Sequence, residues 1–303
     1  KGNIMLTVVI PSYNHEQYIE DCLSATCKID INDLKILVID DGSTDTTVDV
    51  INDFIAANSN LAIELIEKPN SGLVSSLNLA LSLVKTEFMY ICASDDIPMP
   101  AGIKECISFM TKEKNCNFII GGARTISNGL EGGNVYGAEQ ESFINLPPCK
   151  RHKKAFFDYP SPILIQSSVF RAQSIIKKGG WDGDLMLDDY PFFVEMLRNY
   201  PVNRIDFNYL PELLTVKYRQ HSNNSYHNTL RQFKMVDQVI CKLAPESHKV
   251  FAISNCAAHY ILSALKNKKW NDCISIFMLI GFKARFLLFF YIASKVVNKV
   301  KNA

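Results

Sequence analysis

The chain has 303 residues, of which 48% are hydrophobic and 21% are charged. This composition is typical of a globular protein with a substantial core, and it argues against disorder and low complexity. The formal net charge of +1 argues against a nucleic-acid-binding protein, because proteins that neutralise phosphates are usually strongly basic.

The charge is unevenly distributed along the chain. Residues 266–303 carry eight basic side chains and one acidic side chain, a net charge of +7, so residues 1–265 carry a net charge of −6. The acidic body and the basic C-terminal segment therefore need separate explanations. Nine cysteines are scattered without metal-binding spacing, and the first residues show no signal-peptide pattern. We therefore expect a protein of a reducing compartment, the cytoplasm.

The first hundred residues alternate between strand patterns and helix patterns. Short runs rich in Val, Ile and Leu predict strands at residues 6–10, 35–39, 61–66 and 87–93. Between them, apolar residues recur at helical spacing. This alternation with short links predicts an α/β fold, in which helices cover a mostly parallel sheet.

Polar residues follow three of these predicted strands. They are residues 11–14, the pair Asp40-Asp41, and residues 94–96, which include Asp95 and Asp96. Ligands of parallel α/β sheets bind beyond the carboxyl ends of the strands, so these residues predict one shared site. Two adjacent carboxylates repel each other and are well suited to hold Mg²⁺ or Mn²⁺, which commonly bridges to a diphosphate. An ordinary acidic turn is the alternative.

The remainder of the chain is less regular until its last quarter. Residues 121–160 are rich in Gly, Asn and Pro, which indicates loops and short strands around an acceptor. A strand-like run, ILIQSSVF, is followed by a helix that starts near Asp189, and the chain becomes helical beyond residue 228.

Four motifs occur in order over residues 5–96: VVIPSYNHEQYIEDCL, ILVIDDGSTDTT, KPNSGL and FMYICASDD. Together they resemble glycosyltransferase family 2, the inverting nucleotide-sugar transferases of GT-A fold. Weaker matches continue to about residue 225. The resemblance implies a Rossmann-like GT-A catalytic domain over residues 1–227 and a helical C-terminal extension over residues 228–303. Residues 1–100 would bind the nucleotide and residues 101–227 the acceptor.

The resemblance also implies roles in donor binding. Asp41 would accept a hydrogen bond from a ring nitrogen of the base, most naturally uracil, and Gly72 would let the backbone approach the nucleotide. Lys68 is either a nucleotide contact or a plain surface cation. The residues assigned to nucleotide binding are Pro11, Tyr13, Asn14, Asp41, Lys68, Gly72 and Asp95.

Asp96 would be the main protein ligand of the metal, Mn²⁺ or Mg²⁺. His221 would assist the metal and the diphosphate, because Tyr218-Arg219-Gln220-His221 resembles the family's late Tyr-Arg-x-His segment. One departure concerns the residue before Asn78, where many relatives have arginine and this chain has Leu77. One basic contact to the diphosphate is therefore missing or comes from elsewhere.

Asp188 and Asp189 match an acidic pair that opens a helix in the family, and its second member is the catalytic base. Asp189 would deprotonate the acceptor hydroxyl, and Asp188, usually Glu in relatives, would lie on the acceptor side. Carboxylates also stabilise helix N-termini, which does not exclude catalysis. Trp181 and Asp182, in a Gly-Gly-Trp-Asp segment, would contact the acceptor, with Trp181 stacking on a sugar. A buried core tryptophan is the alternative.

Residues 274–293 are strongly apolar and about as long as a bilayer span. Lys283 and Arg285 lie at the centre of this segment, where each costs about 2.5–3.5 kcal/mol on insertion scales. We therefore expect a helix that lies in the membrane interface, with lysines on anionic headgroups, rather than one that spans it. A helical subdomain that packs on the catalytic domain or on a second copy is the alternative, and a homo-oligomer stays open.

Taken together, these patterns predict a metal-dependent, inverting transferase that moves one sugar from a nucleoside-diphosphate sugar, a UDP-sugar, to a glycan acceptor. By resemblance, the acceptor is a polyprenyl-diphosphate-linked oligosaccharide of bacterial O-antigen (lipopolysaccharide) or capsule synthesis, at the inner face of the cell membrane. The Gln-x-x-Arg-Trp signature of processive synthases does not occur, which favours single addition. The alternatives are a transferase acting on polyprenyl phosphate or another lipid, and a non-catalytic GT-A domain that serves in assembly.

Overall fold

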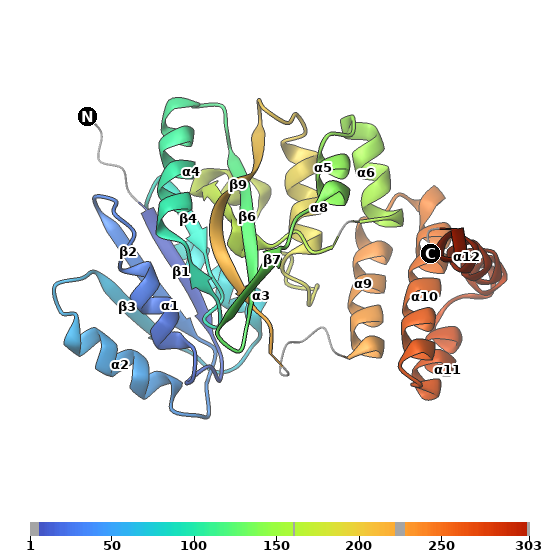
Figure 1. The fold of residues 1–303 in the computed structure, drawn as a ribbon, viewed down its shortest axis with the longest axis horizontal. Coiled ribbons are helices and arrows are strands. Elements are labelled where there is room, and N and C mark those ends of the chain that lie inside the picture. Colours follow the sequence, from blue (N-terminus) through green and yellow to red (C-terminus); the bar gives the residue numbers. More distant parts are fainter. Residues whose placement is uncertain (1–5, 160, 222–227, 302–303) are drawn as a thin grey trace. The chain divides into compact units, whose positions relative to one another are not determined.

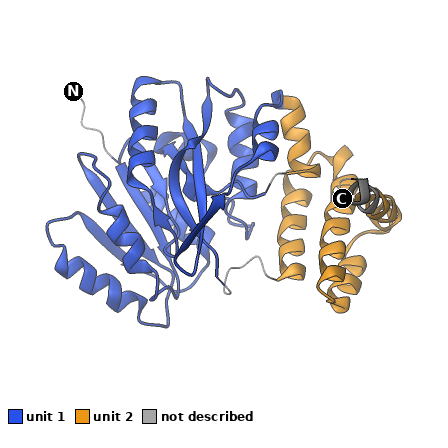
Figure 2. Ribbon diagram, in the orientation of Figure 1, with its two compact units in different colours: residues 1–148, 160–221 blue, residues 149–159, 222–303 orange. Residues whose placement is uncertain are grey.

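The computed structural model describes residues 6–159, 161–221 and 228–301. The chain divides into two compact units (Figure 2): residues 1–148 and 160–221 form unit 1, and residues 149–159 and 222–303 form unit 2. The sequence placed the boundary after residue 227 and missed the contribution of residues 149–159. That segment belongs to unit 2 because Asn255 donates a hydrogen bond to the carbonyl of Phe157, whose ring meets His248 edge to face at 5.7 Å.

Unit 1 is a mixed sheet with flanking helices (Figure 1). The strands are β1 (Leu6–Ser12), β2 (Leu34–Asp40), β3 (Ile63–Glu67), β4 (Phe88–Ile91), β5 (Ile97–Pro98), β6 (Phe118–Ser127), β7 (Leu130–Asn134), β8 (Ser168–Arg171) and β9 (Phe207–Arg219). The helices are α1 (Ile19–Thr26), α2 (Thr47–Ala57), α3 (Leu73–Leu83), α4 (Pro100–Lys112), α5 (Ala138–Ile144), α7 (Ala172–Lys178) and α8 (Tyr190–Asn199), with a 3-10 turn at Ile165–Ser167.

The sheet has a parallel half and a mixed half. Its strand order is β3-β2-β1-β4-β8-β6-β9-β5, with β7 paired to β6. The strands β3, β2, β1 and β4 are parallel, β8 runs antiparallel to both β4 and β6, and β9 returns parallel to β6. The predicted GT-A arrangement of an α/β sheet flanked by helices is therefore confirmed, and all four strands expected in the first hundred residues are present.

The register of the parallel half determines where the site forms. Every residue of β1 is buried, and Ser12 lies beside Asp40 at the carboxyl ends of β1 and β2. On the other side of β1, Val9 pairs with Ile91, the last residue of β4. The polar segments after these three strands therefore begin at neighbouring points on one edge of the sheet.

Unit 2 consists of α6 (Pro148–Phe157), α9 (Thr229–Leu243), α10 (Glu246–Lys266), α11 (Trp270–Leu279) and α12 (Phe282–Lys301). It has a hydrophobic core of its own, made by Phe233, Ala257, Ala258, Ile261, Ile276, Ile280, Ala284 and Leu288. The buried residues of α10 include Ala252, Ala257, Ala258 and Ala264, and the core joins α10 to Ala284 and Leu288 of α12.

The apolar segment at 274–293 is two helices rather than the single helix expected from its hydropathy. The break lies at Ile280-Gly281. Arg285 stabilises it, because its guanidinium donates to the carbonyls of Phe277 at 2.9 Å and Met278 at 2.8 Å, at the C-terminal end of α11. Among the described residues, no helix combines the length and apolarity needed to cross a membrane.

We predict that Gly102→Ala destabilises unit 1 by about 1–3 kcal/mol, because overpacking forces backbone shifts. A Cβ at position 102 of α4 would lie 1.9 Å from the carbonyl oxygen of Leu214 in β9. The measurement is the urea midpoint of unfolding. Gly133→Ala is the control, since a Cβ there meets no atom within 4 Å. Equal midpoints for the two variants would contradict the predicted α4–β9 contact.

Candidate active site

The loop after β1 is fastened to the loop after β2. Asn14 adopts a positive φ of 53°, and its side-chain carbonyl accepts a hydrogen bond from the backbone N–H of Thr44 at 2.7 Å. Asp40 is buried and accepts from the backbone N–H and the hydroxyl of Ser43, at 2.8 and 2.6 Å. Tyr13 is exposed beside this turn, and Pro11 is buried as the sixth residue of β1.

Asp41 organises the segment before α3. Its carboxylate accepts hydrogen bonds from the backbone N–H groups of Ser71 at 2.9 Å and Gly72 at 2.8 Å, and it forms an ion pair with Lys68. Gly72 has a φ of 89°, which favours glycine, and a Cβ there would meet nothing within 4 Å. The structure therefore brings Asp41, Lys68 and Gly72 together, and Lys68 is a mostly buried ion-pair partner rather than a plain surface cation.

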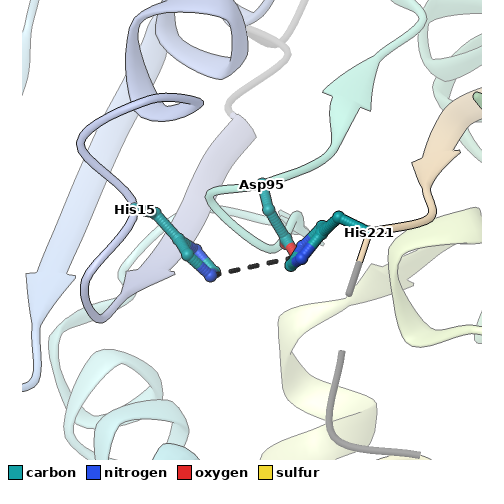
Figure 3. A group of neighbouring side chains, drawn as sticks. All are labelled: His15, Asp95 and His221. Atoms are coloured by element: carbon teal, nitrogen blue, oxygen red, sulfur yellow. Dashed lines mark hydrogen bonds and ion pairs between the residues drawn. The ribbon is translucent and has the colours of Figure 1, made fainter. Parts of the chain in front are cut away.

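Three candidate metal ligands meet after β4. One ligand atom each of His15, Asp95 and His221 lies within 4.8 Å of the others (Figure 3). The distance from His221 Nε2 to Asp95 Oδ2 is 3.0 Å, and that from His15 Nε2 to the same oxygen is 3.9 Å. The three come from the loop after β1, the loop after β4 and the end of β9, so they converge only in the folded chain.

His15 is held in an orientation suited to metal ligation. Its Nδ1 lies 2.7 Å from the hydroxyl of the buried Ser94, which leaves Nε2 facing Asp95. Its backbone N–H donates to the hydroxyl of Thr47 at 2.8 Å. Burial lowers the pKa of His15, although Asp95 opposes this effect, and a neutral imidazole is the form that binds metals.

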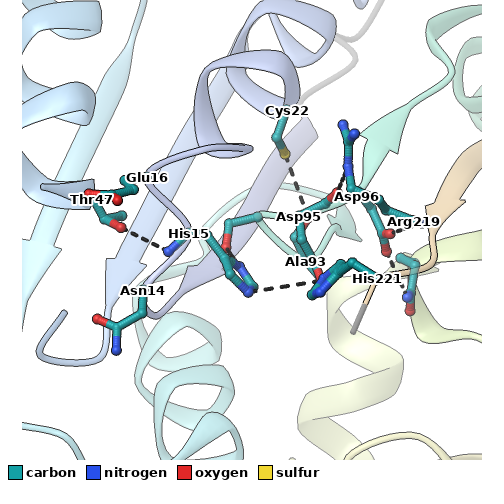
Figure 4. A network of polar contacts seen from close by, with 12 residues as sticks. Asn14, His15, Glu16, Cys22, Thr47, Ala93, Asp95, Asp96, Arg219 and His221 are labelled. Atoms are coloured by element: carbon teal, nitrogen blue, oxygen red, sulfur yellow. Dashed lines mark hydrogen bonds and ion pairs between the residues drawn. The ribbon is translucent and has the colours of Figure 1, made fainter. Parts of the chain in front are cut away.

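Asp96 is fully buried and already has protein partners (Figure 4). Its Oδ1 accepts from the backbone N–H of Arg219 at 2.7 Å, and its Oδ2 accepts from the amide of Gln166 at 2.9 Å. Burial and the neighbouring Asp95 carboxylate raise the pKa of Asp96 well above its usual range, and these two hydrogen bonds oppose the rise. The structure thus groups Asp95, rather than the expected Asp96, with His221.

Arg219 ties the end of β9 to this edge of the sheet. Its Nε donates to the backbone carbonyl of Asp95 at 2.6 Å, and its terminal nitrogen contacts Asp21 at 3.0 Å. The guanidinium lies over the ring of Tyr18, which stacks on His221 at 5.1 Å between centroids. No role was predicted for His15, Tyr18 or Arg219, although all three lie inside motifs that resemble the family.

The donor set fits a divalent cation. Two imidazole nitrogens and one carboxylate oxygen are compatible with Mn²⁺, whereas Mg²⁺ prefers an all-oxygen shell. An ion held by these three residues would have open positions for oxygens of a second molecule. Oxygens of a diphosphate match that requirement.

Asp188 and Asp189 lie at the start of α8, both partly buried. Asp189 is the N-cap, and its Oδ1 accepts from the N–H of Tyr190 at 2.5 Å. Burial, and then the charge of Asp188, raise the pKa of Asp189 to about 7. Burial likewise raises the pKa of Asp188.

Tyr136 is buried against the segment that also contacts Asp96. Burial raises the pKa of the Tyr136 hydroxyl, and its hydrogen bonds with Ser167 and with the backbone of Leu164 oppose the rise. The Tyr136 hydroxyl is 2.6 Å from that of Ser167, and the preceding residue, Gln166, donates to Asp96. Through the adjacent residues Gln166 and Ser167, Tyr136 and Asp96 are therefore held by the same short segment.

The segment at Gly179-Gly180-Trp181-Asp182 differs from its expected role. Trp181 is 4% exposed and stacks on Phe192 of α8 at 4.8 Å, so the ring is core and is not free to stack on an acceptor sugar. The Asn78 side chain holds its backbone with two hydrogen bonds of 2.8 Å. Asp182 accepts from the N–H of Asp184 at 3.0 Å. Leu77 is buried and supplies no polar contact.

Comparison with known proteins gives a consistent match. A family model, "Glycosyl transferase family 2", matches residues 7–179, more than half of the chain. Chondroitin synthase of Pasteurella multocida is 32% identical over 110 residues, which are 36% of this chain but only 11% of that protein. This chain thus spans a small part of the length of that curated relative.

Two solved structures share the fold. TarS residues 1–349 of Staphylococcus aureus in complex with UDP-GlcNAc has a TM-score of 0.59 at 16% identity, covering 94% of this chain and 78% of that one. The mannosyltransferase PcManGT of Pyrobaculum calidifontis, in complex with GDP-Man and Mn²⁺, has a TM-score of 0.57 at 15% identity, covering 100% and 88%. At these identities the likeness shows the fold alone.

We predict that Mn²⁺ stabilises the protein against thermal unfolding through His15, Asp95 and His221. At a free concentration 100 times its dissociation constant, an ion bound to the native state adds about 2.7 kcal/mol. Thermal melting with and without MnCl₂ measures this for His15→Ala, Asp95→Asn and His221→Ala, each of which should lose the added stability. His259→Ala in unit 2 is the control. A full Mn²⁺ effect in His15→Ala would show that His15 is not a ligand.

Proposed function

The chain belongs to glycosyltransferase family 2 and is a glycosyltransferase, and from this premise we propose that it transfers one sugar, with inversion, from a UDP-sugar to a glycan acceptor. The observation that carries the proposal is the polar region at one edge of the sheet. It combines a nucleotide cradle at Asp41 and a candidate cation site at Asp95, and the start of α8 adds a carboxylate with a pKa of about 7, Asp189.

The residues of the cradle would bind the donor. The segment ordered by Asp41 presents Gly72, which has no side chain, so a base and ribose can lie against the backbone. A cation held by His15, Asp95 and His221 would supply charge stabilisation for the leaving diphosphate. Asp96 keeps β9 and Arg219 in place beside that site, and its own ligation of the metal stays a prediction.

Asp189 would act as the general base. Its carboxylate accepts the proton of the acceptor hydroxyl while that oxygen attacks the anomeric carbon. The bond from the anomeric carbon to the diphosphate oxygen breaks in the same displacement, and the nucleoside diphosphate leaves with the electron pair. A pKa near the working pH makes a base both available and strong enough for this transfer. Asp188 and Asp182 would contact the acceptor.

The names of similar proteins support a UDP-sugar as the donor and a glycan as the acceptor. TarS is described as a poly(ribitol-phosphate) β-N-acetylglucosaminyltransferase and was solved with UDP-GlcNAc. Chondroitin synthase supports a polysaccharide product. We propose a polyprenyl-diphosphate-linked oligosaccharide of bacterial surface-polysaccharide synthesis as acceptor, made at the inner face of the membrane. A transferase acting on polyprenyl phosphate itself would be revealed by its product.

Asp189→Asn tests the catalytic role. We expect transfer from a panel of UDP-, GDP- and dTDP-sugars to fall by at least about 100-fold, because general-base catalysis contributes about 10²–10⁴. Binding of the donor, measured by calorimetry, should be unchanged. Wild-type transfer rates in Asp189→Asn would contradict the proposal, and wild-type protein that binds donor without transfer would favour a non-catalytic assembly role.

The pH dependence of transfer follows from the pKa of Asp189. A base works in its deprotonated form, so kcat/KM should rise with pH and level off above about 7. Asp188→Asn removes a negative charge that raises this pKa, so the rising limb should move to lower pH. If the rising part of the pH profile lies at the same pH in Asp188→Asn as in the wild type, the profile reports the titration of a group other than Asp189.

We further propose that unit 2 lies on an anionic membrane surface through α11 and α12. Over the part of these helices whose side chains the structure describes, residues 270–295, eight large apolar side chains are exposed: Trp270, Ile274, Met278, Leu279, Phe282, Phe286, Phe289 and Phe290. Soluble monomers rarely expose large apolar patches without a partner. Residues 273–301 contain no Asp or Glu and five basic side chains, which favours anionic headgroups.

Sedimentation with vesicles tests this surface. We expect wild-type protein to bind vesicles that contain phosphatidylglycerol, and Phe289→Ser/Phe290→Ser to lose most of this binding, because both rings are exposed. Deleting α11 and α12 is a poorer test, since Ile276 and Leu288 belong to the core of unit 2. Leu130→Ser, an exposed leucine of unit 1, is the control. Undiminished binding in the double variant would contradict the proposal.

A further inference from the structure

A groove lies between the first turns of α10 and α12 in unit 2. Its volume is about 460 Å³, which falls in the range of pockets that hold small ligands. The residues that line it are Ser247, Val250, Phe251, Phe282, Lys283, Phe286 and Leu287. The walls are almost entirely apolar, so a ligand with hydrocarbon character fits better than a sugar or a nucleotide.

Lys283 is the one charged residue in this lining. It is exposed, and the structure gives it no ion pair among the described residues. The other cation of the first turn of α12, Arg285, is engaged with the carbonyls at the end of α11. Lys283 is therefore available to pair with an anion held at the rim of the groove.

The charge of the surroundings decides between occupants. Residues 273–301 contain no acidic residue, and Glu246, next to Ser247 on α10, is paired with Lys249. A second copy of the α12 face would therefore bring like charges together, and self-association through α12 is disfavoured. An anionic lipid matches both the apolar walls of the groove and the positive charge of Lys283, because its chain is apolar and its phosphate is complementary to an ammonium group.

We propose that this groove binds one hydrocarbon chain of an anionic membrane lipid, with the lipid phosphate on Lys283. The site is distinct from general adsorption of the exposed aromatic side chains to a bilayer, since it holds a single molecule. This lipid site is separate from the sugar-transfer reaction. Because it is tested by a binding measurement alone, the result does not depend on whether the proposed reaction is correct.

Calorimetry with dodecyl phosphate, below the concentration at which it forms micelles, tests the proposal on the full chain. We expect one molecule bound per protein and a negative heat-capacity change, because apolar surface is buried. Lys283→Glu should weaken binding by about tenfold or more, since a charge-assisted hydrogen bond is replaced by repulsion. Ser247→Trp, at an exposed position of the lining, should fill the groove and abolish binding.

Two comparisons isolate the groove. Lys234→Glu makes the same change in net charge at an exposed position of α9, outside the lining, and should leave binding within about twofold. Phe289→Ser/Phe290→Ser should lose vesicle binding and still bind dodecyl phosphate, which separates this site from the membrane surface proposed above. No binding by the wild type, several molecules bound per chain, or equal binding by Lys283→Glu, Ser247→Trp and wild type would each overturn the proposal.

Discussion

Four carboxylates crowd one edge of the sheet, and the structure depends on how their mutual repulsion is compensated. The Asp40 carboxylate is stabilised by two hydrogen bonds from Ser43, and that of Asp41 by two backbone N–H groups and an ion pair with Lys68. The buried Asp96 accepts hydrogen bonds from Gln166 and from the backbone of Arg219. Asp95 meets two imidazoles instead. It is thus the carboxylate best placed to share a cation, because its partners are themselves metal ligands.

This compensation joins segments that are distant in the chain. The pairing of β9 with β6 brings Arg219 and His221 to the end of β4. There Asp96 accepts one hydrogen bond from the backbone N–H of Arg219 and one from the side-chain amide of Gln166. Asn78 of α3 forms a second connection, because its two hydrogen bonds fix the backbone of Trp181, whose ring packs on α8. The helix that follows the nucleotide cradle therefore also supports the helix that begins at Asp189.

In unit 2 the charge that must be accommodated is the guanidinium of Arg285, which lies in the apolar segment 274–293. A cation in an apolar segment is costly unless it is paired or solvated. Arg285 is accommodated because the segment breaks into two helices and the guanidinium satisfies carbonyls that the end of α11 leaves free. Lys283, two residues earlier, is exposed in the lining of the groove between α10 and α12. Several aromatic side chains of α12 are exposed, whereas its Ala284 and Leu288 belong to the core of unit 2.

The sequence by itself determined the parallel half of the fold and the acidic strand ends, because strand periodicity and short-range motifs are local properties. It predicted β1 to β4, the convergence of Asp41 and Asp95, and the helix that starts at Asp189. Tertiary structure alone decided that His15 joins Asp95 and His221, that Trp181 is buried against Phe192, and that residues 149–159 pack in unit 2. Each of these depends on contacts between residues far apart in the chain, and burial there is decided by neighbours that no local pattern specifies.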